Sequence, residues 1–157
     1  MFFWGIDPWY RKLGYAIVND DLDIVEAGIV VHNLEKSRDS QIQRMLQTID
    51  FVQDLMSKFP PILIGMEKVF FSHQNQANAE FVFGLRGIIY FLAKEGQILE
   101  YSPTQIKKYI TGTGKANKLL MQQMIQKIFG LEQIPQFDDA ADALALAYLA
   151  FKKYQWR

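Results

Sequence analysis

Short apolar runs alternate with turn-forming residues over the first 31 positions of the chain. The runs at residues 2–7, 14–19 and 23–31 are rich in aliphatic and aromatic side chains, which favour β-strands. Short links separate the runs, and strands joined by short links pair in antiparallel order because a parallel pair needs a long crossover. The chain is therefore predicted to open with three antiparallel strands.

The hydrophobic period lengthens after residue 37. Apolar side chains recur every three or four positions over residues 37–59, which predicts an amphipathic helix ended by Pro60 and Pro61. Residues 77–94 are apolar nearly all round, which predicts a helix covered on two sides. Further helices are expected at residues 103–110 and 119–129, and an alanine- and leucine-rich helix at 136–153.

Two more apolar runs, at residues 62–67 and 97–102, have the length and composition of strands. Five strands interspersed with helices, the first three antiparallel, predict an α/β fold with a mixed five-stranded sheet. The 157 residues contain no internal repeat, low-complexity segment or linker. Residues 1–157 are therefore predicted to form a single domain.

Composition narrows the class of protein. Half of the residues are hydrophobic and 22% are charged, which excludes a disordered chain. The absence of cysteine removes disulfides, thiolate catalysis and cysteine-ligated zinc, and it fits a reducing compartment. The sequence has no apolar window long enough to span a membrane and no basic signal-peptide start, so a cytoplasmic location is expected.

The formal net charge is zero, but the charges are unevenly distributed. Residues 101–131 contain five lysines and no acidic residue: Lys107, Lys108, Lys115, Lys118 and Lys127. Such a segment fits a surface that binds nucleic acid, and it equally fits an ordinary solvated helix and loop. The segment "GTGK" within it is not a phosphate-binding P-loop, because Tyr109 stands where that motif requires its first glycine.

Acidic residues stand at the ends of several predicted elements. Asp7 and Glu67 end apolar strands, and Asp138, Asp139 and Asp142 begin the last helix. Taken singly, each has an ordinary interpretation as a turn opener, a strand end or a helix N-cap. Taken together, converging carboxylates would repel one another unless they were protonated or bound a cation, and their oxygens suit Mg²⁺ or Mn²⁺. Helical spacing allows either Asp138 or Asp139 to share a face with Asp142.

Four segments resemble the motifs of the RuvC family of Holliday junction resolvases, in order and spacing. They are "GIDPxxRxxGY" from Gly5, "MEKVFF" from Met66, "EYSPTQIKKYITGTGKANK" from Glu100 and "DAADALALA" from Asp139. The resemblance covers nearly the whole chain. It implies a ribonuclease H-like fold and a homodimeric endonuclease that cuts four-way DNA junctions symmetrically.

The resemblance also implies roles for individual residues. The catalytic, metal-binding acids of the family fall on Asp7, Glu67, Asp139 and Asp142, which leaves Asp138 as an N-cap or an exposed neighbour. These acids would hold two Mg²⁺ ions, with Mn²⁺ able to substitute. Trp9 and Tyr10 depart from the family, which usually has a small residue after "GIDP".

Contacts to DNA and to partners are expected from the same resemblance for Phe70 and for a motor, and from the residue pattern for the lysines and for the dimer helix. Phe70 would stack on or wedge bases at the junction crossover, and four lysines would meet phosphates: Lys107, Lys108, Lys115 and Lys118. Residues 77–94 are the candidate dimer helix, with burial inside the monomer as the alternative. A branch-migration motor complex is a further expected partner.

Two other functions remain under consideration. The start of the chain also resembles the phosphate loop of actin-like ATPases, but those enzymes need a second similar domain for which 157 residues leave no room. A related ribonuclease H-like nuclease or binding protein acting on RNA–DNA hybrid or other branched nucleic acid stays open, because metal ligands do not read the context of a phosphodiester.

Overall fold

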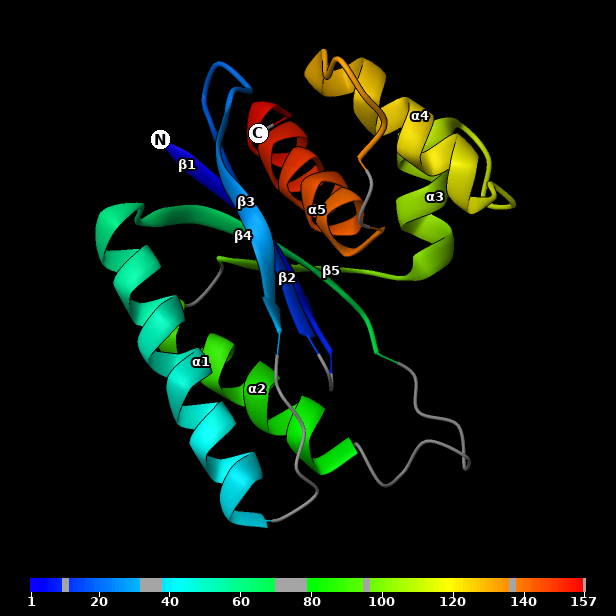
Figure 1. Cartoon of the computed structure of the whole chain (residues 1–157). Helices are drawn as coiled ribbons and strands as arrows, with labels where there is room; N and C mark the ends of the chain where they lie inside the picture. Colours follow the sequence, from blue (N-terminus) through cyan, green and yellow to red (C-terminus); the bar gives the residue numbers. More distant parts are fainter. Residues whose placement is uncertain (10–11, 32–37, 70–78, 95–96, 136–137, 157) are drawn as a thin grey trace.

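A mixed β-sheet forms the centre of the molecule. The computed structural model describes residues 1–9, 12–31, 38–69, 79–94, 97–135 and 138–156. Within these residues the chain forms a five-stranded sheet in the order β3-β2-β1-β4-β5 (Figure 1). The strands are β1 (Phe2–Pro8), β2 (Lys12–Asn19), β3 (Ile24–Val31), β4 (Pro61–Glu67) and β5 (Ile98–Tyr101). β1, β2 and β3 pair antiparallel, and β4 pairs parallel with both β1 and β5. The predicted α/β fold with a mixed sheet is confirmed.

Helices cover both faces of the sheet (Figure 1). They are α1 (Arg38–Lys58), α2 (Ala79–Leu92), α3 (Pro103–Thr111), α4 (Lys118–Phe129) and α5 (Asp138–Gln155). α1 and α2 lie on one face, and α5 lies on the other with α3 and α4 beside it. The helices predicted from periodicity are all present, with ends shifted by a few residues. No helix in the described part of the chain is long and apolar enough to cross a membrane.

The two faces of the sheet bury separate hydrophobic cores. Because side chains alternate along a strand, Trp4 and Ile6 of β1 point toward α1 and α2, whereas Phe3 points toward α5. The Trp4 indole also donates a hydrogen bond to the Phe59 carbonyl at 2.9 Å, which fixes the end of α1 against the sheet. Both layers are thus anchored to β1, the central strand.

Glycines allow α5 to lie directly on the sheet. A Cβ on Gly5 of β1 would stand 1.8 Å from the Ala143 carbonyl oxygen, and one on Gly65 of β4 would stand 2.3 Å from the Leu146 carbonyl oxygen. Real Cβ atoms do not approach backbone so closely, so any other residue would push the helix away. The two strands therefore fix the distance of α5 from the sheet near its N-terminus.

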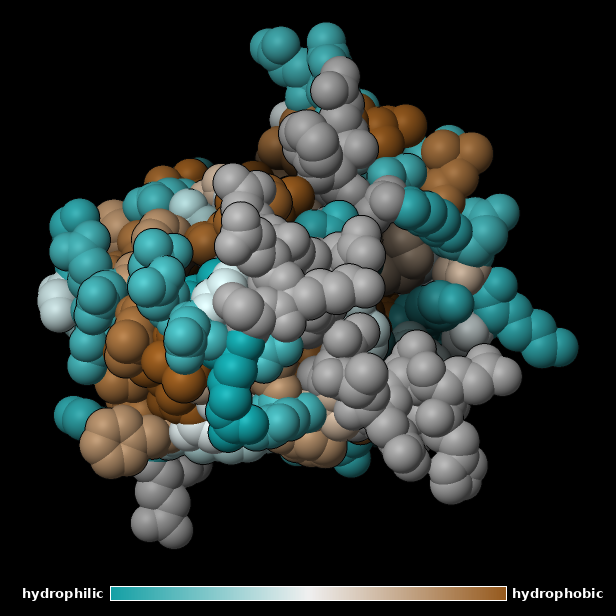
Figure 2. Space-filling view, turned by 60° about the horizontal axis from the view of Figure 1, so that its bottom comes forward, coloured by the Kyte–Doolittle hydropathy of each residue, from teal (hydrophilic) through white to brown (hydrophobic). Residues whose placement is uncertain are grey.

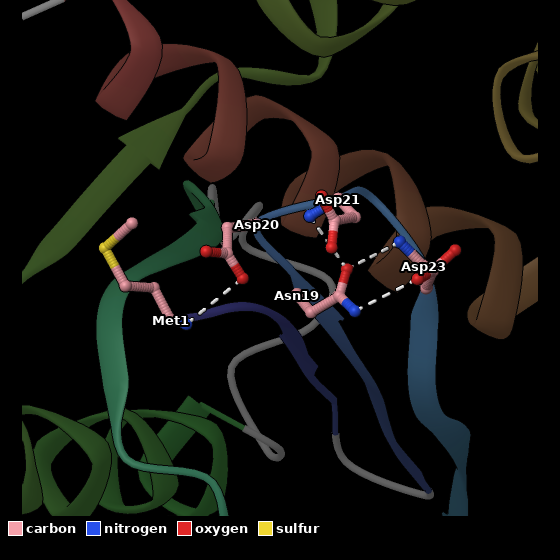
Figure 3. Close-up of polar contacts among 5 residues, drawn as sticks. All are labelled: Met1, Asn19, Asp20, Asp21 and Asp23. Atoms are coloured by element: carbon pink, nitrogen blue, oxygen red, sulfur yellow. Dashed lines mark hydrogen bonds and ion pairs between the residues drawn. The ribbon is translucent and has the colours of Figure 1, made fainter.

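The acidic turn between β2 and β3 is held by its own asparagine (Figure 3). The Asn19 side-chain oxygen accepts hydrogen bonds from the amides of Asp21, at 3.0 Å, and Asp23, at 2.8 Å. The Met1 amino group pairs with Asp20 at 3.3 Å. The acids of this turn therefore serve local structure, as expected of Asx turns.

The prediction that α2 is covered on two sides is wrong for the single chain. α2 packs against α1 and the sheet through buried residues that include Phe81, Leu85 and Ile89. On its other side Phe83 and Phe91 remain 56% and 86% exposed. Figure 2 brings forward the lower side of the molecule as drawn in Figure 1, and apolar side chains reach its surface between polar ones. A helix that is apolar all round can be covered by more of its own chain or by another molecule, and the sequence pattern does not distinguish the two.

Candidate active site

Asp7 and Glu67 lie next to each other at the carboxyl ends of two parallel strands. β1 and β4 are paired as far as Ile6 with Met66, so the next residues on each strand are Asp7 and Glu67. Each stands two positions after the glycine that contacts α5, so both side chains point to the α5 face. Together with Trp9 they line a pocket at this end of the sheet, whose other walls are Lys68, Val69 and Pro103.

α5 brings a further carboxylate, that of Asp142, close to Glu67. Ala143 and Leu146 are the helix residues that rest on Gly5 and Gly65. Asp142 lies one turn before Leu146, on the side of the helix above β4. Asp139 lies in the first turn of α5, and its side chain is outside what the structure describes. The close contact between α5 and the sheet thus directs the start of the helix toward the ends of β1 and β4.

Glu67 lies close enough to Asp142 for the two carboxylates to interact electrostatically. Burial raises the pKa of Glu67 above its ordinary value of 4.5, and the negative charge of Asp142 raises it further. Lys107 and Arg86 act in the opposite direction, since their positive charges favour the carboxylate. A half-buried carboxylate repelled by a second one is stabilised by a proton or by a cation. The donor set is therefore chemically suited to a hard divalent metal ion.

The described side chains do not complete a metal site by themselves. Within the part of the chain that the structure describes, no three acidic or histidine side chains form a group that could hold a metal ion. Asp7, Glu67 and Asp142 form part of the predicted tetrad, and Asp139 is the member whose side chain lies outside the description. The assignment of the four acids as metal ligands stays a prediction.

Two of the four predicted lysines lie beside the acids. Lys107 of α3 and Lys118 of α4 line one pocket with Asp142, and Gln122 forms another part of its wall. α3 ends at Gly112, whose φ of 83° is left-handed, and the chain then turns into α4, which brings these two lysines together. Lys108 and Lys115 are exposed, and neither lines this pocket. Phe70 and Tyr10 lie outside the described residues.

Sequence reasoning missed an arginine at this site. Arg86 of α2 is 4% exposed, and its guanidinium donates to the main-chain carbonyl of Glu67 at 2.8 Å. It also pairs with Glu100 of β5 and donates to the Tyr90 hydroxyl at 3.1 Å. Lys68, which follows Glu67, was missed as well, although it lines the pocket of Asp7 and Glu67. The signal available for Arg86 was a charged residue inside an otherwise apolar helix.

Comparison with known proteins identifies the family. The family model described as crossover junction endodeoxyribonuclease RuvC matches residues 3–149. This chain belongs to the RuvC family. A relative from Fusobacterium nucleatum subsp. nucleatum, named crossover junction endodeoxyribonuclease RuvC, is 37% identical over 90% of this chain and 75% of its own. A relative of the same name from Pseudothermotoga lettingae is also 37% identical, over 94% of this chain and 92% of its own.

Solved structures agree with the RuvC assignment. The structure of Thermus thermophilus RuvC superposes with a TM-score of 0.82 at 27% identity, over 99% of this chain and 97% of the other. Thermus thermophilus RuvC in complex with a Holliday junction substrate superposes with a TM-score of 0.83 at 27% identity, over 100% of this chain and 95% of the other. The yeast mitochondrial Holliday junction resolvase Ydc2, at 17% identity and a TM-score of 0.61, shares the fold. The predicted family and ribonuclease H-like fold are thus confirmed.

Proposed function

We propose that this RuvC protein is a Mg²⁺-dependent endonuclease that resolves four-way (Holliday) DNA junctions by symmetric paired nicks during recombination and repair. Its relatives are named crossover junction endodeoxyribonucleases, so the chain is an endodeoxyribonuclease of the resolvase family. The observation that carries the proposal is the position of Asp7 beside Glu67, with Asp142 close enough to raise the pKa of Glu67. Acids held together at such an energetic cost are typical of a site for divalent metals.

The proposed metal ligands are Asp7, Glu67, Asp139 and Asp142. Bound Mg²⁺, in a pair of sites, would supply activation of water and stabilisation of charge at the scissile phosphate, and Mn²⁺ would serve as a substitute. The role of the chain is to hold its carboxylates in place before metal arrives. Gly5 and Gly65 do this by seating α5 against β1 and β4, which sets the separation between helix acid and strand acid.

Lysines would bind the phosphates on either side of the cut. Lys107 and Lys118 are best placed, because they line the pocket that contains Asp142. Lys108 and Lys115, which are exposed on the same segment, would contact phosphates further along an arm of the junction. We retain Phe70 as the proposed stacking or wedging residue at the crossover. Each phosphate neutralised releases counterions, so junction binding would weaken as salt rises.

A second copy of the chain is the proposed partner at α2. Phe83 and Phe91 are exposed on this helix, together with Tyr90 at 42%. Large apolar side chains gathered on one exposed helix face favour burial in an interface. A two-fold dimer would present two active sites to the two strands of a junction that is itself two-fold, as paired incision requires.

The remaining statements about the whole protein rest on family resemblance. We propose that residues 1–157 form one nuclease domain that acts in the cytoplasm and that receives junctions from a branch-migration motor. The alternative is that the same site cuts RNA–DNA hybrid or other branched nucleic acid, because metal-binding acids do not read the substrate around the phosphodiester.

The experiment compares cleavage of a mobile synthetic four-way junction, a linear duplex and an RNA–DNA hybrid in Mg²⁺. Paired, ligatable nicks in the junction alone are expected. Asp7→Asn keeps the shape of the side chain but removes a ligand charge, so cleavage should collapse while junction binding survives. Cleavage of the hybrid instead, or junction binding without cutting by the unmodified protein, would overturn the resolvase assignment.

A further inference from the structure

The last carbonyl of β4 lacks the hydrogen-bond donor that the sheet would normally supply. The amide of Ile64 donates to the carbonyl of Gln97, the residue before β5, at 2.7 Å, and the amide of Lys68 donates to the carbonyl of Tyr101 in β5 at 2.8 Å. Because backbone groups alternate in direction along a strand, the carbonyl of Glu67 points the other way, toward β1. Continuing the parallel register, its donor there would be the amide of residue 8. Residue 8 is Pro8, which has no N–H.

Arg86 supplies the missing donor. Its guanidinium reaches the Glu67 carbonyl from α2 at 2.8 Å, and this contact crosses from the helix layer to the strand end. A buried carbonyl without a donor is costly, and a charged donor makes a stronger hydrogen bond than a neutral amide. The side chain of Glu67, on the opposite face of the strand, is one of the proposed metal ligands. The orientation of that side chain depends on the main chain that Arg86 holds.

Arg86 is itself held in one position. Its guanidinium pairs with Glu100 of β5, and Tyr90 contributes its hydroxyl to the same group. The ring of Tyr90 lies 5.8 Å from the guanidinium carbon. The planar fork of an arginine holds its several N–H donors in a fixed, spread geometry, which the compact, rotatable ammonium of a lysine does not reproduce. The guanidinium of Arg86 is thus held by several partners, whereas a single ion pair with Glu100 would already have neutralised its charge.

We propose that Arg86 is a positioning residue for the metal site: it replaces the hydrogen bond that Pro8 cannot give and so fixes the main chain of Glu67. The proposal rests on the proposed function, in which Glu67 is a metal ligand. This positioning role differs from a direct role in catalysis, because Arg86 donates to the main-chain carbonyl of Glu67 and not to the Glu67 carboxylate. One groove is lined by Arg86, Phe83 and Tyr90. The hydrogen bonds of Arg86 therefore lie next to the exposed face of α2 that is proposed to bind the second copy.

The first test measures Mn²⁺ binding to the full chain by calorimetry, without DNA. Arg86→Lys is expected to weaken Mn²⁺ binding about tenfold, the lower end of what loss of a residue that orients a ligand costs. The Mg²⁺ concentration for half-maximal junction cleavage should rise correspondingly, and excess Mg²⁺ should restore much of the rate. The control is Arg38→Lys, which makes the same replacement at an exposed arginine 3.8 Å from Glu80.

A second pair of variants tests whether Arg86 acts on Mn²⁺ binding through the main-chain carbonyl of Glu67. Pro8→Ala restores an N–H opposite the Glu67 carbonyl, so in the Arg86→Lys background it should recover part of the lost Mn²⁺ affinity. Glu100→Gln weakens the anchor of Arg86 and should give a smaller loss in the same direction, which keeps the test valid if Arg86→Lys does not fold. Both variants are first checked by circular dichroism.

The outcomes separate the two proposals. If Arg86→Lys and Glu100→Gln bind Mn²⁺ like the unmodified protein, or if Pro8→Ala recovers none of the loss, Arg86 is not a positioning residue. If the unmodified protein fails to cut the junction, the proposed function is wrong, and the Mn²⁺ comparison still decides the role of Arg86.

Discussion

Gly5 lies directly beneath Ala143, so closely that a Cβ on Gly5 would stand 1.8 Å from the Ala143 carbonyl oxygen. Gly5 precedes Asp7 by two residues, and Ala143 follows Asp142 immediately. The contact that packs α5 on the sheet is therefore the same contact that brings the acids of the helix and the strand together. The packing of α5 and the spacing of these acids therefore depend on one distance.

The first prediction concerns this contact. Gly5→Ala should destabilise the protein by about 3 kcal/mol or more, because the added methyl group meets backbone and not a side chain that could move away. The measurement is urea unfolding. Gly87→Ala is the control, because a Cβ there would meet nothing within 4 Å and alanine favours the helix by up to about 1 kcal/mol. Equal stability of the two variants would mean that α5 does not rest on Gly5.

The second prediction concerns the stability of the metal-free protein at different pH values. The pKa of Glu67 is raised in the folded state, chiefly by burial and next by Asp142. The contribution of this group to stability is therefore fully present below its ordinary value of 4.5 and is lost as pH rises through the raised pKa. At neutral pH Glu67→Gln should unfold at a higher temperature than the unmodified protein in EDTA.

Added Mg²⁺ provides the control for this pH effect. It should stabilise the unmodified protein and have less effect on Glu67→Gln, because a ligand charge has been removed. Thermal unfolding between pH 5 and pH 8 measures both effects. A Glu67→Gln variant less stable than the unmodified protein in EDTA would show that the carboxylate is not strained by its surroundings.

The sheet and the two strand acids could be predicted because their signals are local. Apolar runs that end in Asp7 and Glu67 mark two strand ends. The position of these strands side by side is set by a parallel pairing between residues about sixty positions apart, which no local pattern encodes. Family resemblance supplied the selection of Asp139 over Asp138, which helical spacing alone left open.

The role of Arg86 could not be predicted for a physical reason. It lies 19 residues after Glu67 in the sequence and contacts its carbonyl, a group that every residue has. The need for that contact arises from Pro8, on a third element. The lysines show the same limit, since Lys118 lies 11 positions after Lys107 and the turn between them decides that the two meet at one pocket.

The third prediction concerns DNA binding by the lysines. Lys118→Gln should reduce the slope of log affinity against log salt by about 0.9 for a four-way junction, because one phosphate contact is lost. The measurement is a binding titration in EDTA between low and physiological salt. Lys127→Gln, an exposed position in the last turn of the same helix that does not line the pocket, should leave the slope unchanged. Equal slopes for the two variants would place the DNA elsewhere.

The last prediction concerns the exposed face of α2. Phe91 is 86% exposed, so Phe91→Glu should leave the fold of the single chain intact while placing a charge in the proposed interface. A charge buried without a partner is costly, so the dimer dissociation constant should rise at least about tenfold. Sedimentation velocity over a range of concentrations measures this, with Leu119→Glu, at a 53% exposed position of α4, as the control. A cleavage assay gives a second readout. Where Phe91→Glu is monomeric, junctions should be nicked in one strand and rarely in both, because paired incision needs two active sites on one junction. A Phe91→Glu protein that sediments and nicks like the unmodified one would show that the chain pairs through another surface.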